Sequence, residues 1–376
     1  MNGQTERLCA ILDLFELEGD VVEVVPHRAG HINDTFIART RTKGGTRRYT
    51  LQRINASVFP RPDLIMHNIR IVSEAIRKKN EEAGEDPDSR GLTLVHAQGR
   101  PFHTDEDGSF WRCYHYVEGV TYNQISCDGT GILIAGEAAA AFRRFQDHLG
   151  GLDTRQLHVT IEDFHNTPVR FRRFEEAIAL DSHGRTVDAA REIESARARE
   201  TLCGVINEAL ERRSIPFRVA HNDTKINNVV FDDRQKGGPR ALCVIDLDTV
   251  MPGSSLYDFG DLVRSCVCNR PEDETDLDAI GVNLDLFRAL VKGFCGDRDG
   301  GRIIFTGEER ELLVAASMVI TFETGLRFLT DYLSGDVYFR VGRLRHNLDR
   351  ARAQFRLLTD MEQKRDMMER IVTETA

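Results

Sequence analysis

What this sequence lacks excludes several classes of protein. It has one tryptophan among 376 residues, and its 50 Lys and Arg are outnumbered by 60 Asp and Glu, which gives a net charge of −10. Because the basic residues are spread along the chain, there is no electrostatic basis for binding nucleic acid. No apolar run approaches the roughly 18 residues that a membrane-spanning helix needs. The first residues also lack the basic and apolar regions of a secretory signal. We therefore expect a cytoplasmic protein with no membrane partner.

The eight cysteines are scattered and form no C-x-x-C pair, and Cys266 and Cys268 are too close together for the usual zinc spacing. Reduced thiols are the expectation. There is no internal repeat and no low-complexity segment. The length allows two domains or one two-lobed unit.

The spacing of apolar residues changes near residue 118. Before it, short segments predict about five strands, together with a helix over 61–79. After it, apolar residues recur at helical spacing, and only the region 219–248 again has the pattern of strands. We therefore predict an α+β, two-lobed, protein-kinase-like fold. Residues 1–118 would form a small nucleotide-binding lobe with an antiparallel sheet plus one helix, and residues 119–376 a larger, mainly helical lobe for catalysis and substrate binding.

The strongest chemical signal lies within 219–248. The segment 221–228 reads HNDTKINN, so Asp223 and Asn228 have the spacing of a kinase catalytic loop, H-x-D-x-x-x-x-N. Two apolar runs separated by a turn follow, and the second ends at Asp246. In this chemistry one Asp accepts the proton of the attacking hydroxyl, while the Asn and a later Asp hold metal ions on the nucleotide phosphates. The pattern predicts Asp223 as the base and Asn228 and Asp246 as magnesium ligands.

Other polar residues nearby have more than one explanation. Lys225 could stabilise charge on the transferring phosphate, or it could be a solvated loop residue. Asp248 could be a second metal ligand or could touch the substrate. The letters D-F-G at 258–260 do not close the strand that follows the catalytic loop. We therefore interpret Asp258 and Asp261 as structural, an N-cap and a buried acid that binds loop amides.

A nucleotide site needs further groups from the first lobe. The segment 30–33 lies between two predicted strands, where kinases place a loop over the phosphates, although it has one glycine and not G-x-G-x-x-G. Backbone groups of the hinge, residues 116–118, would bind adenine. The predicted cofactor-binding residues are Gly30, Asn33, Tyr116, Val117, Glu118 and Lys225.

The third strand departs from the kinase pattern. Gln52 stands where a protein kinase has its phosphate-binding lysine, and Arg53 points to the other face of the sheet. The phosphate charge must then be met by backbone amides, magnesium, Arg53 or Lys225, or nucleotide binding is weak.

These segments resemble the aminoglycoside phosphotransferase/choline kinase-like family, and within it most closely the N-acetylhexosamine 1-kinases. The shared stretches cover almost the whole chain: GHIN at 30–33, FHNTP at 164–168, IDLDT at 245–249, MPGS at 251–254, DFGD at 258–261, GLRFL at 325–329 and GDVYF at 335–339. The resemblance implies ATP and Mg²⁺ as cofactors and phosphorylation of the anomeric hydroxyl of GlcNAc or GalNAc. It also implies the assigned roles of Asp223, Asn228 and Asp246, and contact of His31 and Arg327 with the sugar.

Arg327 can also be considered from its position in the chain. On a helix predicted over 308–333, Glu323 and Arg327 share an otherwise apolar face. They could form an i,i+4 ion pair that stabilises the helix. Alternatively, Arg327 could bind sugar hydroxyls or an amide while Glu323 holds it in place.

Other functions fit parts of the pattern. The acceptor could be an aminoglycoside, choline, ethanolamine or homoserine. An aminoglycoside pocket should be strongly acidic and a choline pocket should have an aromatic cage, and an inward-facing Arg327 suits neither cation. Gln52 would also fit a non-catalytic pseudokinase that serves as a binding module, but Asp223, Asn228 and Asp246 are all present.

Overall fold

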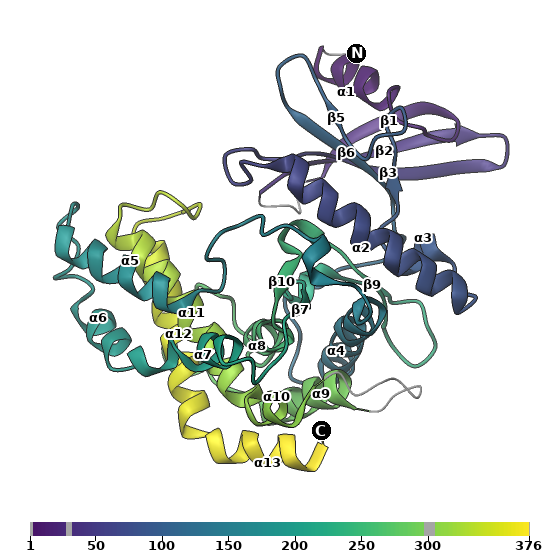
Figure 1. Ribbon diagram of the computed structural model, residues 1–376. Coiled ribbons are helices and arrows are strands. Elements are labelled where there is room, and N and C mark those ends of the chain that lie inside the picture. Colours follow the sequence, from purple (N-terminus) through teal and green to yellow (C-terminus); the bar gives the residue numbers. More distant parts are fainter. Residues whose placement is uncertain (1–2, 28–31, 297–304, 376) are drawn as a thin grey trace.

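A computed structural model of the chain describes residues 3–27, 32–296 and 305–375 and has the predicted α+β, two-lobed form (Figure 1). The N-terminal lobe holds a six-stranded antiparallel sheet in the order β1-β2-β3-β6-β4, with β5 paired to β6. Its strands are β1 (Asp20–His27), β2 (Asp34–Thr42), β3 (Gly45–Arg53), β4 (Leu94–Val95), β5 (His103–Thr104) and β6 (Phe110–His115).

Helices cover this sheet on two sides. Helix α1 (Gly3–Leu12) packs its apolar side chains against Phe36, Leu51 and Trp111. Helix α2 (Pro62–Glu82) lies between the sheet and the C-terminal lobe (Figure 1). Its stripe of isoleucines and valine joins the core that extends through that lobe, so α2 packs the two lobes together.

The sheet has six strands, one more than the five predicted. The apolar spacing of residues 5–17 also predicts a first helix, which the structure has as α1, ending at Leu12. The short α3 (Pro87–Arg90) is not predicted, because it lies in a segment without a clear helical period. Strands β4 and β5 have two residues each and both pair with β6. β4 lies within a strand predicted over 92–98, whereas β5 falls in a predicted turn and is too short to show any alternation of apolar residues.

The C-terminal lobe is mainly helical. Its helices are α4 (Gly129–Leu149), α5 (Thr167–Leu180), α6 (Ala190–Arg197), α7 (Val205–Glu211), α8 (Ser255–Cys266), α9 (Leu284–Cys295), α10 (Gly307–Glu311), α11 (Leu313–Leu333), α12 (His346–Gln363) and α13 (Arg365–Thr375). Two small hairpin-like pairs lie near the first lobe: β8 (Val229–Asp232) with β9 (Arg240–Val244), and β7 (Arg218–Ala220) with β10 (Met251–Gly253).

Helix α11 runs through the centre of this lobe and contacts α12, α8 and α5. It is separate from α10, because the chain turns at Leu312, so the single helix predicted over 308–333 is in fact two. By length and composition α11 resembles a membrane span, but 78% of its most apolar window is buried inside the protein. Its apolar character is therefore accounted for by the core.

The chain crosses between the lobes just after β6. Val120 exchanges two backbone hydrogen bonds with Phe231 of β8, at 2.9 and 2.8 Å. At Gly119 an added Cβ would lie 2.5 Å from the Phe231 carbonyl oxygen and 2.5 Å from Val230 Cγ1, so a side chain would not fit. The crossing is thus packed directly onto the hairpin that follows the catalytic loop.

Candidate active site

Strand β7 leads into the predicted catalytic loop, residues 221–228, and the buried His221 side chain supports this loop from within. The His221 side chain has no exposed surface and meets the rings of Phe142 and Phe145 edge to face. Its Nδ1 accepts a hydrogen bond from the Asp223 amide at 3.3 Å, and its Nε2 donates to the Ile245 carbonyl at 3.0 Å. The ring thereby joins the catalytic loop to the end of β9.

A carboxylate from α8 fixes the same loop. Asp258 is fully buried, and its two oxygens accept the backbone amides of His221 at 3.0 Å and Asn222 at 2.7 Å. Gln146 of α4 also donates to it, at 2.5 Å. Burial raises the pKa of Asp258, and the surrounding donors oppose that rise. With these amides satisfied, Asn222 is held at a positive φ of 64°, where few non-glycine residues lie.

Two roles predicted for the D-F-G region change. The N-cap of α8 is Ser254, whose hydroxyl accepts the Leu256 amide, and Asp258 lies inside the helix. Asp258 is the acid that binds loop amides. Asp261 instead pairs with Arg264 at 2.9 Å. Both acids are structural, as expected, but the assignment of an N-cap to Asp258 is wrong because α8 begins earlier than the sequence indicates.

The structure places the predicted base and one predicted metal ligand side by side. The amide nitrogen of Asn228 donates to the Asp223 carbonyl at 2.8 Å and to its carboxylate at 3.1 Å. Lys225 Nζ lies 3.1 Å from the other Asp223 oxygen. Burial would raise the pKa of Asp223, but the positive charge and hydrogen bond of Lys225 outweigh it and lower the pKa. Asp223 is therefore a carboxylate at neutral pH.

Asp246 follows β9 in a left-handed backbone conformation, φ 63° and ψ 64°. The preceding amide, of Ile245, donates to the Asn228 carbonyl at 2.9 Å, so the two predicted ligands lie on adjoining backbone segments. Crowding by protein atoms, with the charges of Asp248 and Asp223, raises the pKa of Asp246 to about 7. Solvent nevertheless reaches its side chain, so Asp246 lies at the protein surface and not in the core.

These residues fit a magnesium site. Within residues 3–27, 32–296 and 305–375, the Asp246 carboxylate has no hydrogen-bond or ion-pair partner, and the Asn228 side-chain oxygen is likewise unused. Those ranges hold no cluster of three or more His, Cys, Asp or Glu able to bind a metal by itself. Mg²⁺ commonly takes one or two protein oxygens and fills its remaining positions with phosphates and water, which this donor set permits.

Asp248 is not exposed to a ligand. It forms a bidentate pair with Arg112 of β6, whose Nη2 lies 3.0 Å from Asp248 Oδ2, and both side chains are almost completely buried. Asn33 donates to the same carboxylate at 2.7 Å. Arg112 also donates to Gln52 at 2.9 Å, and Gln52 donates to Thr35 at 3.0 Å. Of the two explanations left open for Asp248, neither matches its surroundings.

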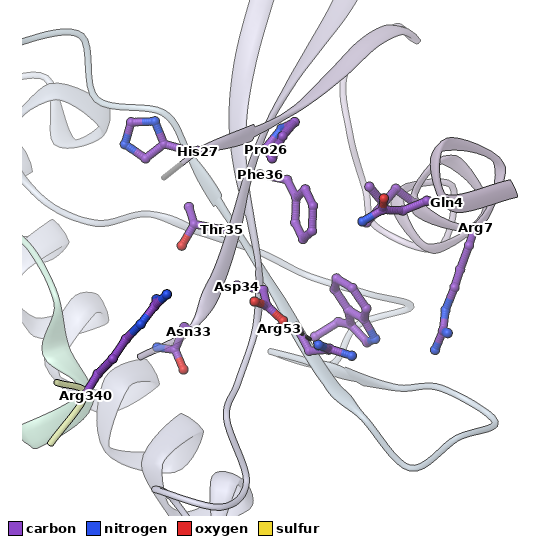
Figure 2. A pocket seen from close by; sticks show the side chains of 12 residues that line it. Gln4, Arg7, Pro26, His27, Asn33, Asp34, Thr35, Phe36, Arg53 and Arg340 are labelled. Carbon is purple, nitrogen blue, oxygen red and sulfur yellow. Dashed lines mark hydrogen bonds and ion pairs between the residues drawn. The ribbon is translucent and has the colours of Figure 1, made fainter. Parts of the chain in front are cut away.

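The predicted nucleotide-binding residues fall in different places. Gly30 lies outside the described residues. Asn33 uses its side-chain oxygen to accept the Asn55 amide at 3.0 Å and its nitrogen to bind Asp248, so its amide group serves the protein. The alternative cation Arg53 is on the outer face, paired with Asp34 at 2.5 Å (Figure 2).

At the hinge, Arg48 stacks over the Tyr116 ring, 4.2 Å from its centroid, and forms an ion pair with Glu118. The backbone amides of Val117 and Glu118 have no protein acceptor in the described part of the chain. They are available to a planar heterocycle, which is the role predicted for the hinge.

Of the two predicted sugar-binding residues, the structure describes only Arg327. His31 lies outside the described residues. Arg327 of α11 has no hydrogen bond or ion pair with any described residue, and its guanidinium lies 5.4 to 5.9 Å from the ring centroids of Phe164, Tyr338 and Phe339. Tyr338 is 60% exposed. Arg327 is thus a cation with aromatic walls and no counter-ion.

Glu323 does not pair with Arg327. Its oxygens bind His165 Nδ1 at 2.8 Å and the Thr167 hydroxyl at 2.6 Å, and Arg170 lies 3.6 Å away. Burial would raise the pKa of Glu323, but the charge and hydrogen bond of His165, with Arg170 and Thr167, lower it to about 2. Both the i,i+4 ion pair and the idea that Glu323 holds Arg327 are therefore wrong, because α5 and the segment before it supply nearer partners.

Glu323 instead connects α11 to the catalytic loop. His165 lies between them, with its Nε2 3.2 Å from the Asn222 carbonyl. Both ring nitrogens therefore lie within hydrogen-bond distance of an oxygen atom. The residue next to Asp223 is thus linked, through His165 and Glu323, to the helix turn that carries Arg327.

Two cavities flank this region. One, of about 690 Å³, lies at the edge of the sheet beside α1 and is lined by Asn33, Thr35 and Arg340 among others; Figure 2 shows Arg340 reaching toward these two residues from the C-terminal lobe. The other, of about 980 Å³, is lined by His165, Asn222 and a largely apolar set of neighbours. Neither is lined by Asp223 or Asp246, so the motif geometry and not cavity size locates the site.

Sequence reasoning does not single out Arg112, His165 or Tyr338. Arg112 is a lone cation in an apolar strand, and its position opposite Gln52 becomes visible only once the register of β3 and β6 is known. His165 and Tyr338 belong to shared stretches, but nothing in their spacing indicates which partners they meet.

Residues 23–289 match the model of the phosphotransferase enzyme family. Among solved structures, the chain is similar to an aminoglycoside phosphotransferase from Alicyclobacillus acidocaldarius, with a TM-score of 0.59, 14% identity and 96% of each chain covered. It is also similar to a choline kinase from Cryptosporidium parvum, with a TM-score of 0.54, 12% identity and 96% of each chain covered.

A third similar structure is the amicoumacin kinase hAmiN in complex with AMP-PNP, Ca²⁺ and Ami. Its TM-score is 0.54 and its identity 13%, over 97% of this chain and 94% of that one. At these identities the structures show the fold alone.

The Glu323 site yields a prediction about stability. The pKa of Glu323 falls from 4.5 to about 2 on folding, and each pKa unit is worth about 1.4 kcal/mol. Glu323→Gln should therefore lower the free energy of unfolding at pH 7 by about 3 kcal/mol. Because the folded pKa is depressed, the wild-type advantage should persist above pH 4.5 and shrink as the pH falls toward 2.

Urea unfolding between pH 7 and pH 3 measures this difference. Glu176→Gln, an exposed change on the neighbouring α5, is the matched control and should leave the free energy of unfolding nearly unchanged. A Glu323→Gln variant whose unfolding free energy follows the wild type at every pH would contradict the ion-pair assignment.

Proposed function

The chain belongs to the phosphotransferase enzyme family, and on that basis we propose that it transfers the γ-phosphoryl group of ATP to the anomeric hydroxyl of an N-acetylhexosamine, GlcNAc or GalNAc. The observation that carries the choice of acceptor is Arg327, a guanidinium with aromatic walls and no counter-ion among the described residues.

In the proposed reaction Asp223 is the catalytic base. The carboxylate accepts a hydrogen bond from the anomeric hydroxyl and takes its proton as the sugar oxygen bonds to the γ-phosphorus. The bond from that phosphorus to the β,γ-bridging oxygen breaks at the same stage, so the products are ADP and the sugar 1-phosphate. Asn228 orients Asp223 through its amide hydrogen bonds, and Lys225 offers a positive charge near the transferred group.

Asn228 and Asp246 would hold magnesium through their unused oxygens, and the metal would neutralise phosphate charge. We place adenine at the backbone of residues 116–118 and the phosphates near Gly30, Asn33 and Lys225. We also place the lobe boundary at residue 118, with 1–118 binding nucleotide and 119–376 binding the sugar. The eight cysteines are all free thiols, which supports a cytoplasmic location.

The surroundings of Arg327 favour a neutral acceptor. Its positive charge, with Arg170 close enough to influence it, would repel an aminoglycoside, choline or ethanolamine. A guanidinium can instead donate to ring hydroxyls or to the carbonyl of an acetamido group. The exposed Tyr338 ring offers a flat apolar face on which a sugar could pack. The pseudokinase alternative is disfavoured because Asp223, Asn228 and Asp246 are all present in the sequence.

A panel of acceptors tests the proposal. Incubation with MgATP should give ADP and a 1-phosphate, detectable by phosphorus NMR, with GlcNAc or GalNAc. Glucosamine, choline, ethanolamine, homoserine and an aminoglycoside should be turned over at least about tenfold more slowly, the discrimination expected when one recognition group is unmatched. Preferential turnover of choline or of an aminoglycoside would refute the assignment of the acceptor while leaving the phosphotransferase activity intact.

The role of Asp223 predicts the effect of its isosteric replacement. Asp223→Asn removes the proton acceptor and should lower kcat by about 10²- to 10⁴-fold, with little change in the melting temperature. Asp233→Asn, an exposed change on the β8–β9 turn, serves as the control and should leave kcat unchanged. Near-normal kcat in Asp223→Asn would show that another group is the base.

Arg327 should act on the acceptor alone. Arg327→Gln should raise the KM for the N-acetylhexosamine by about 10- to 100-fold, the loss expected for hydrogen bonds from a charged donor, without changing the KM for ATP. Arg197→Gln, which breaks an exposed pair with Glu175, is the control. A fall in melting temperature with both KM values unchanged would mean that Arg327 has a structural role only.

A further inference from the structure

Three elements of the N-terminal lobe converge on the short segment after Asp246. Arg112 of β6 and Asn33, which precedes β2, both bind the Asp248 carboxylate. From α2, the buried Asn68 donates to the Val250 carbonyl at 2.9 Å. Each contact joins residues more than 130 positions apart and links the N-terminal lobe to the C-terminal lobe.

The arrangement around Gln52 explains why these contacts are needed. A protein kinase links its β3 lysine to a glutamate of the following helix, but here β3 has Gln52. On α2, Glu74 is exposed and pairs with Arg70 of the same helix at 3.0 Å. Gln52 and Arg112 are directly opposite in the paired strands, and the Gln52 side chain accepts from Arg112. The positive charge next to position 52 is therefore supplied by Arg112 of the neighbouring strand β6 and not by a lysine of β3.

We propose that the Arg112–Asp248 pair is an inter-lobe latch that positions Asp246 for the magnesium-bound nucleotide, replacing the link that a β3 lysine would make. Arg112 and Asp248 are positioning residues, since neither side chain has exposed surface with which to touch a ligand. The inference depends on the proposed magnesium–nucleotide site and is independent of the acceptor.

Two physical arguments support a positioning role. A buried ion pair contributes little net stability compared with apolar residues of similar size, because removing both charges from water is costly. A bidentate guanidinium–carboxylate pair, however, allows one geometry only. Asp248 lies two residues after Asp246, whose left-handed conformation is unfavourable without external support. By fixing the position of Asp248, Arg112 also restricts the backbone at Asp246, the predicted metal ligand.

Variants of the full-length protein separate positioning from stability. Arg112→Lys keeps the charge but loses the bidentate fork. The double variant Arg112→Met with Asp248→Leu replaces both charged side chains by apolar ones of similar size, so it should fold. Arg39→Gln, which breaks the exposed pair with Glu23 on the same sheet, is the control for loss of one arginine. Each is examined by thermal unfolding and by calorimetric titration with ATP at a series of Mg²⁺ concentrations, without any acceptor.

The latch predicts a rise of about 10- to 100-fold in the Mg²⁺ concentration that half-saturates ATP binding in both Arg112→Lys and the double variant, as expected when a group that orients a metal ligand is lost. Arg39→Gln should match the wild type. Folded variants that bind MgATP with wild-type constants would overturn the latch and leave the proposed function standing. A wild-type protein that binds no MgATP would overturn the proposed nucleotide site itself, and with it the basis of the latch.

Discussion

The catalytic loop depends on one buried carboxylate, that of Asp258. An acid without exposed surface is costly to ionise, and it is tolerated here because the His221 and Asn222 amides and Gln146 all donate to it. Those bonds connect α8 and α4 to the end of β7 and hold Asn222 in its left-handed conformation. Asp223 comes next in the chain, so its direction is set from outside the loop. Removing the carboxylate would leave two buried amides without acceptors.

A second carboxylate binds consecutive backbone amides of a loop on the proposed acceptor side. Asp331, at the end of α11, accepts the consecutive amides of residues 337, 338 and 339 at 2.8 to 3.0 Å, and Asn347 donates to it as well. This carboxylate shapes the loop that presents Tyr338 beside Arg327. Glu323, two turns earlier on the helix, is hydrogen-bonded to His165 and Thr167. Both acids of α11 therefore bind other groups: Asp331 binds loop amides and Glu323 binds a histidine. Arg327 is the charged residue of α11 that has no hydrogen bond or ion pair with a described residue.

The sequence was sufficient for the parts that depend on local pattern. The two-lobed α+β fold, the strands on either side of the catalytic loop, α2 and the spacing of Asp223 and Asn228 all follow from periodicity and from residue order. It was insufficient where register or tertiary choice decides. Helical spacing predicted an ion pair between Glu323 and Arg327, but Glu323 binds His165, which is 158 positions away in the chain. Likewise, the cation opposite Gln52 is known only when β3 and β6 are paired. Periodicity along the chain predicts which residues share a face of a helix or strand. It does not predict which residue from a distant segment will contact that face.

The absence of a lysine at position 52 has a consequence for how the two lobes cooperate. With a lysine there, the charge near the phosphates would belong to the N-terminal lobe and could form its own pair within that lobe. Here the corresponding arginine is bonded across the cleft to Asp248, two residues from the predicted metal ligand. Separating the lobes would break this buried ion pair, so the proposed latch couples movement of the N-terminal lobe to the position of Asp246. With the proposed latch, the geometry of the proposed magnesium site becomes a property of both lobes together.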